Sequence, residues 1–139
     1  MATLQAIIDE IQDQVGAISG IRGAPDEPPD SINAFPFAVA YVDVGEYHIG
    51  PPNLMTGLHT IIVELHVARK DLERDVGRAM VYAKSIPNAV FAALKDSTYT
   101  AFQTLERITY EFGPLDWGDL QTIGFRFRLE GVKSQDEIT

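Results

Sequence analysis

The first hydrophobic pattern in the chain lies close to its N-terminus. Apolar residues recur there at the spacing of one helix face, whereas polar residues such as Gln5, Asp9 and Gln12 mostly occupy the other side. Thr3 suits the N-cap of such a helix and Gly20 its end. The pattern therefore predicts an amphipathic helix that lies on a sheet. Its apolar positions are Leu4, Ile7, Ile8, Ile11, Val15 and Ile18.

Prolines and acidic residues dominate residues 21–36. This composition sustains neither a helix nor an interior strand, and the helix before it is too short to be a domain. We therefore predict an acidic surface loop inside one domain that spans residues 1–139. The loop contains Gly23, Pro25, Pro28, Pro29 and Pro36 together with Asp26, Glu27 and Asp30.

Two strand patterns follow this loop. Residues 37–44 are nearly all apolar and partly β-branched, which is typical of a strand covered on both faces. Residues 58–68 alternate instead, and we predict that they form a hairpin with the first strand. One face of the second strand should carry Ile61, Val63, Leu65 and Val67, and the other Thr60, Ile62, Glu64 and His66.

The connection between these strands, residues 45–57, is much longer than a usual hairpin loop. Apolar side chains stand there beside Pro51 and Pro52. We expect a protruding loop whose apolar side chains contact another protein. The candidates for this protein interface are Tyr47, Ile49, Leu54 and Met55.

The next segment has helical character as far as Leu94. Asp71 is a suitable N-cap, and an apolar stripe follows it at helical spacing. Pro87 either ends or kinks this helix, or begins a further helical piece that buries Val90, Phe91 and Leu94.

Two more strands, residues 107–112 and 121–132, complete the pattern. Ile108, Tyr110 and Phe112 should share one face of the first, and turn-forming residues 114–119 should connect it to the second. Residues 133–139 resemble a flexible tail. The fold class is therefore α+β, in the order α-β-β-α-β-β, with a mostly antiparallel four-stranded sheet that carries helices on one face. The apolar face of the last strand should comprise Ile123, Phe125, Phe127 and Leu129.

The amino-acid composition argues against several classes of function. The chain has no cysteine, which excludes disulfides, thiolate metal sites and cysteine nucleophiles. Its net charge is -9, and residues 1–60 carry eight acids against Arg22 as the single base. This acidity disfavours tight binding of nucleic acid. No signal segment or membrane-spanning apolar run is evident, so we expect synthesis in the cytosol and no membrane partner.

Few residues suggest chemistry. His59 and His66 should lie on opposite strand faces and therefore cannot share a metal. Glu64 and His66 share one face, where they could act as a catalytic base pair, but pairing of Glu64 with Arg126 or Arg128 across the strands is the simpler use.

The remaining candidates are weaker. Asp116 and Asp119 lack a calcium-binding pattern, and no serine stands in a nucleophile motif. Trp117 suits either an interface anchor or a turn residue folded onto the sheet. We therefore predict that the protein is not an enzyme and has no catalytic residue, cofactor or metal.

Residues 56–132 resemble the tail terminator (tail completion) proteins of long-tailed bacteriophages. The likeness rests on TGLHTIIVELHVARKDLERDVGRAMVYAKSIPNAVFAAL and on ITYEFGPLDWGDLQTIGFRFRLEGV. In that family a strand ending in a V-x-R-x-D-L phrase enters a helix, and a D-S-T segment precedes a hairpin with alternating aromatic residues. The matching positions are Val67, Arg69, Asp71 and Leu72, then Asp96, Ser97 and Thr98, then Phe125 and Phe127.

The resemblance implies a virion structural protein, assembled in the host cytoplasm. It would form a homohexameric ring on the head-proximal end of the tail tube, stop polymerisation of the tube protein and join the tail to the head connector or neck protein. DNA would pass through without specific binding, and we expect Asp26, Glu27 and Asp30 to face the channel. The alternatives are a head-completion or neck adaptor of the same machinery, or a small ligand-binding α+β domain that uses Glu64 and His66.

Overall fold

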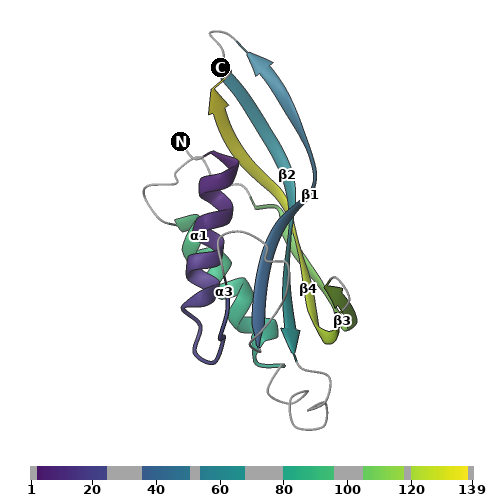
Figure 1. The fold of residues 1–139 in the computed structure, drawn as a ribbon. Helices are drawn as coiled ribbons and strands as arrows, with labels where there is room; N and C mark the ends of the chain where they lie inside the picture. The colour runs from purple at the N-terminus through teal and green to yellow at the C-terminus, as the bar shows by residue number, and fades with distance from the viewer. Residues whose placement is uncertain are drawn as a thin grey trace.

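The computed structural model describes six segments of the chain, residues 3–24, 36–50, 54–67, 80–95, 105–117 and 120–137. They form an α+β structure in which a four-stranded antiparallel sheet accompanies two helices, in the predicted chain order (Figure 1). The elements are α1 (Leu4–Gly16), β1 (Phe37–Gly50), β2 (Leu54–Val67), α3 (Tyr82–Lys95), β3 (Arg107–Trp117) and β4 (Leu120–Glu137).

Helix α1 begins where the sequence predicts. The side chain of Thr3 accepts a hydrogen bond from the backbone N–H of Ala6 at 3.2 Å, which confirms it as the N-cap. The helix ends at Gly16, earlier than predicted, and Gly20 adopts a positive φ of 97° in the turn beyond it. Gln12 departs from the polar face because its side chain is buried and donates to the carbonyl oxygen of Ala38.

The sheet has the strand order β1-β2-β4-β3. This differs from the order along the chain because β4 pairs with β2 and places β3 at the edge. We call the helix side of the sheet its inner face and the opposite side its outer face. Helix α1 contacts α3, β1 and β4, and one core cluster unites both helices with the inner face. Its buried sheet members include Ala38, Ala40, Ile61, Val63, Leu65, Phe125, Phe127 and Leu129.

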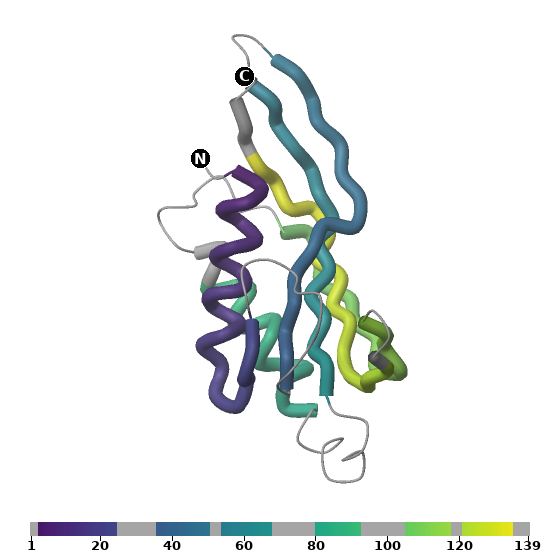
Figure 2. Tube along the Cα trace, viewed as in Figure 1, coloured from purple at the N-terminus to yellow at the C-terminus, as the bar shows by residue number. Residues whose placement is uncertain are grey.

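The strands are longer than the sequence suggests. Residues 45–57 are not a long loop, because β1 continues to Gly50 and β2 starts at Leu54. The expected tail is also a strand, since β4 pairs with β2 as far as Glu137. Residues 44–50 of β1, 54–60 of β2 and 130–137 of β4 therefore form a three-stranded arm, which projects past α1 in Figures 1 and 2.

The arm departs from the body at two irregularities. The register of β1 and β2 shifts between Val42 and Val44, and that of β2 and β4 shifts beside His59. Gly131 lies at the second shift with a positive φ of 83°, a conformation that favours glycine. These bulges bend the sheet. Val132 at the base of the arm still belongs to the core cluster, whereas Ile49 near the end of the arm is 75% exposed.

Helix α3 continues through Pro87. Ile86 and Val90 are buried in the core, but Phe91 is 50% exposed, so its predicted burial is wrong. The outward stripe of this helix includes Phe91, since position 91 is one residue past the buried Val90 and points about 100° away from it. The proposed N-cap Asp71 lies outside the described residues.

The end of β3 approaches the outer face of β1 and β2. The ring of Trp117, at the end of β3, lies 6.3 Å from that of Tyr41 on β1 and 5.8 Å from that of His66 on β2. Gly113 and Gly124 pair across this hairpin. A Cβ atom at Gly124 would overlap the carbonyl oxygen of Leu65 and lie 2.9 Å from its carbon, so β4 approaches β2 closely only because this residue is glycine.

Replacement of Gly124 should therefore weaken the fold. We expect Gly124→Ala to lower the free energy of unfolding by about 1–3 kcal/mol, because the methyl group forces two backbones apart. The matched control is Gly113→Ala, where a Cβ meets open space, and its effect should stay within about 0.5 kcal/mol. Urea unfolding followed by the fluorescence of Trp117, the only tryptophan, measures both. If the two variants were equally stable, the claim that β4 can approach β2 at position 124 only with glycine there would be wrong.

Candidate functional site

The two predicted histidine positions belong to different environments. His66 lies in the body beside Glu64 and Trp117, and His59 lies in the arm beside Ser134 and Tyr47. Within the six described segments, no group of three or more His, Asp or Glu side chains is arranged to hold a metal ion.

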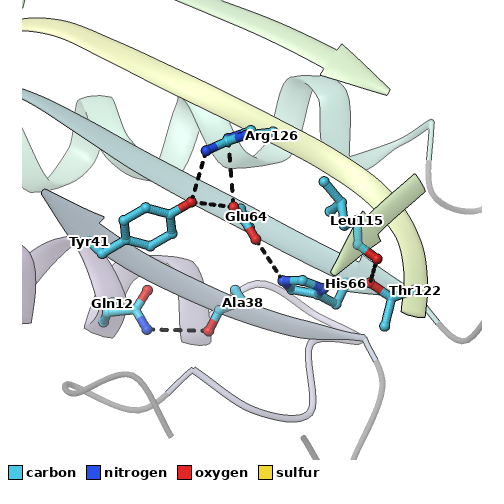
Figure 3. A network of polar contacts seen from close by, with 8 residues as sticks. All are labelled: Gln12, Ala38, Tyr41, Glu64, His66, Leu115, Thr122 and Arg126. Carbon is cyan, nitrogen blue, oxygen red and sulfur yellow. Dashed lines mark hydrogen bonds and ion pairs between the residues drawn. The ribbon is translucent and has the colours of Figure 1, made fainter. Parts of the chain in front are cut away.

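The outer face of β2 carries a network of polar contacts (Figure 3). Nε2 of His66 lies 2.9 Å from Oε1 of Glu64, and Nδ1 lies 2.5 Å from Oγ1 of Thr122 on β4. Thr122 in turn donates to the carbonyl oxygen of Leu115 on β3 at 3.5 Å. The chain of contacts thereby connects β2, β4 and β3.

The second oxygen of Glu64 has partners on both flanking strands. Tyr41 of β1 donates its hydroxyl hydrogen to Oε2 of Glu64. Arg126 of β4 donates to the hydroxyl oxygen of Tyr41 at 3.2 Å, and its Nε lies 3.6 Å from the same Oε2. Glu64 therefore has both partners that the sequence offered as alternatives, the histidine and a cross-strand arginine.

The charges of this network explain its protonation. Burial alone raises the pKa of Glu64, but the hydrogen bonds from His66 and Tyr41 and the positive charge of Arg126 outweigh it, and the pKa lies below its ordinary value. Burial and the bond to Glu64 raise the pKa of Tyr41 to about 12. Near neutral pH Glu64 is therefore a carboxylate and Tyr41 a donor.

This arrangement is better suited to stability than to catalysis. The side chain of His66 is fully buried and Glu64 is 5% exposed, so neither offers an atom to a bound substrate. Because Glu64 accepts, Nε2 of His66 is the donor in this contact and does not act as a base. A carboxylate with a lowered pKa that three side chains already contact is a weak general base.

A second buried pair lies in the arm. Nε2 of His59 lies 2.7 Å from Oγ of Ser134, and both residues are nearly inaccessible to solvent. The imidazole occupies space that Cβ atoms at Gly45 and Gly57 would fill. Sequence reasoning missed this pair because it assigned Ser134 to a flexible tail. Gly45, opposite His59 on β1, and Gly57, two residues before it on β2, were a usable signal.

The other predicted residues are distributed as follows. Ile49 is 75% exposed and Tyr47 is 44% exposed, while Met55 and Leu54 are partly buried. All four lie on strands of the arm, not on a loop.

Of the acidic residues predicted to lie in a turn or to face the channel, the structure describes only Asp116. Asp116 is exposed at the end of β3. Its neighbour Asp119 and the three channel candidates, Asp26, Glu27 and Asp30, lie outside the described residues. For Trp117 the structure favours the second of the two interpretations, since its ring packs against the outer face of the sheet.

Glu64 gives a pH-dependent test of this network. Glu64→Gln should lower the free energy of unfolding at pH 7 by about 1–3 kcal/mol, since it removes a charged hydrogen-bond acceptor. A depressed pKa stabilises the fold above the unfolded value of about 4.3, and this contribution is lost as the pH falls through the folded value. The difference between wild type and variant should therefore shrink below about pH 4, as measured by urea unfolding at several pH values.

The control for this experiment is Glu111→Gln. Glu111 is exposed on β3 and pairs in register with the same Arg126. Its replacement should change stability by no more than about 0.5 kcal/mol. A difference between wild type and Glu64→Gln that stays constant from neutral to acid pH would show that the charge of Glu64 does not stabilise the fold.

Among the described residues, no helix has the length and apolar character needed to cross a membrane. Comparison of the chain with models of known protein families gives no match, and comparison with curated proteins gives none either.

Proposed function

We propose that this protein is a virion structural protein of the tail terminator type, which forms a ring on the head-proximal end of a phage tail tube. The observation that carries the proposal is the three-stranded arm. It extends beyond α1 and exposes Ile49 and Tyr47 to solvent. Exposed apolar side chains on a projecting sheet are typical of protein contacts, so the arm is the surface that neighbouring subunits or the tube would cover.

The sheet edges support the same proposal. In the part of the chain that the structure describes, β1 and β3 are the two edge strands, and they differ in sequence and length. With both helices packed on the inner face, as the fold prediction has it, each subunit offers two unlike sides. Unlike complementary sides are what a head-to-tail ring requires.

The polar residues of the body also favour a structural role. Glu64, His66, Tyr41 and Arg126 are engaged with one another, and burial removes the first two from any ligand. The small ligand-binding domain that would use Glu64 and His66 is therefore less consistent with the geometry than a protein that functions through its surfaces.

In this role the ring would bind the tube protein on one side and the head-tail connector or neck protein on the other. DNA would pass through the ring without specific binding, in keeping with the net charge of -9. A neck adaptor of the same machinery would use similar surfaces but would bind the portal side. Addition of the purified protein to growing tubes distinguishes the two, because only a terminator stops their elongation.

The arm gives the direct test of assembly. Ile49→Ser combined with Leu54→Ser should raise the protein concentration needed for ring formation at least about tenfold, since tenfold corresponds to only about 1.4 kcal/mol and each aliphatic side chain contributes more when it is buried. Size-exclusion chromatography with light scattering measures the assembly state.

The matched control keeps the arm apolar. Ile49→Leu combined with Leu54→Ile should assemble like the wild type, and urea unfolding should show that both double variants retain a folded body. The proposal fails if the serine variant assembles as well as the wild type, or if the wild-type protein remains a monomer at all concentrations and in the presence of tube ends.

A further inference from the structure

The outer face has a groove where the body meets the arm. It encloses about 470 Å³ and draws its lining from all four strands or the residues next to them. The bulges that bend the sheet at this level open the groove, since Gly131 and the shifted Val44 both line it. The groove is therefore a consequence of the same irregularities that create the arm.

The lining combines apolar and acidic side chains. Val44 is 56% exposed and Leu58 is 36% exposed, and they supply the apolar part. Glu46 and Glu106 are exposed and supply negative charge. Glu130 pairs with Arg107, and Glu46 lies 3.6 Å from Nε2 of His48, which is outside the lining. Three carboxylates against one guanidinium give the lining a net negative charge. A complementary surface would present apolar side chains around a cation.

Such a surface exists on this same chain, along the outward side of α3. Val81, at the start of the helix, is 64% exposed, and Phe91, ten residues later, is 50% exposed. Lys84 and Asn88 lie between them and are exposed. Helical spacing places these residues on one stripe, opposite Ile86 and Val90, which are buried in the core.

We propose that the groove of one subunit receives the outward stripe of α3 from a second copy of this chain. Phe91 and Val81 would cover the apolar lining, and Lys84 would lie against the exposed carboxylates of Glu46 and Glu106. The dimensions agree: the stripe is about 15 Å long at 1.5 Å per residue. The groove crosses the four strands of the sheet, about 14 Å at the usual strand spacing.

This contact deepens the proposed function and rests on it. Ile86 and Val90 of α3 belong to the inner-face core, whereas the groove opens on the outer face. The groove and the α3 stripe are therefore different surfaces. A subunit that offers its groove to one neighbour still has its α3 stripe available for the next. That is the head-to-tail relation from which a ring closes.

Disulfide trapping tests the contact directly, because the chain contains no cysteine of its own. Phe91→Cys and Leu58→Cys are prepared as two separate full-length variants and mixed under mild oxidation. We expect a crosslinked dimer in the mixture and little in either variant alone. The control replaces Phe91→Cys by Gln5→Cys, an exposed position on α1, and should give no crosslink with Leu58→Cys.

Charge reversal supplies an independent measurement. Lys84→Glu, and likewise the double variant Glu46→Lys with Glu106→Lys, should each raise the concentration needed for assembly at least about tenfold. An equimolar mixture of the two variants should assemble better than either alone, because both possible contacts between unlike variants bring opposite charges together.

The outcomes separate the contact from the function. Heterologous crosslinking together with recovery of assembly in the mixture supports the contact. Rings that form without a crosslink between positions 91 and 58 and tolerate charge reversal overturn it and leave the proposed function standing. Crosslinks between two copies of Leu58→Cys overturn it as well, because they report a symmetric dimer. Absence of any assembly overturns both.

Discussion

The structure depends on the burial of β2 on both of its faces. Every residue from Ile61 to Val67 is buried, although alternate side chains point in opposite directions. The core cluster covers one side, and Trp117 at the end of β3 packs on the other. A carboxylate and an imidazole on the second side cannot retain water, so they must find partners inside the protein. The network around Glu64 follows from this requirement, and so does the close approach of β4 at Gly124.

The same constraint divides the chain into a body and an arm. Double-sided burial of β2 ends at the bulges beside Val44 and His59, and beyond them β1, β2 and β4 continue as a sheet whose end extends past α1 (Figure 1). The buried contact of His59 with Ser134 still ties the middle strand of the arm to β4. Apolar side chains such as Ile49 remain exposed there. The chain thus has a body with a buried core and an arm on which Ile49 and Tyr47 are exposed.

Sequence reasoning captures the parts of this fold that depend on local periodicity. The alternation of β2 and β4, the aromatic positions Phe125 and Phe127 and the cap at Thr3 follow from spacing and side-chain type alone. The arm is not predicted from the sequence, because the glycines in residues 45–57 resemble loop residues. In the structure two of these glycines, Gly45 and Gly57, leave space for the ring of His59. The contact of Tyr41 with Glu64 depends on strand register, which periodicity does not fix, and the position of Trp117 depends on a bend in the hairpin.

The two proposed contact surfaces differ in physical character, and this difference bears on assembly. The arm offers apolar side chains, whose burial is insensitive to moderate salt and weakens on cooling. The groove adds exposed charges, whose attraction is screened over about 8 Å at physiological ionic strength and therefore acts only at short range. Apolar burial would supply most of the binding energy, while the charged groove would select the head-to-tail orientation over others. Such a separation of affinity from orientation suits a subunit that must close a ring rather than extend a filament, because closure demands a fixed angle between neighbours.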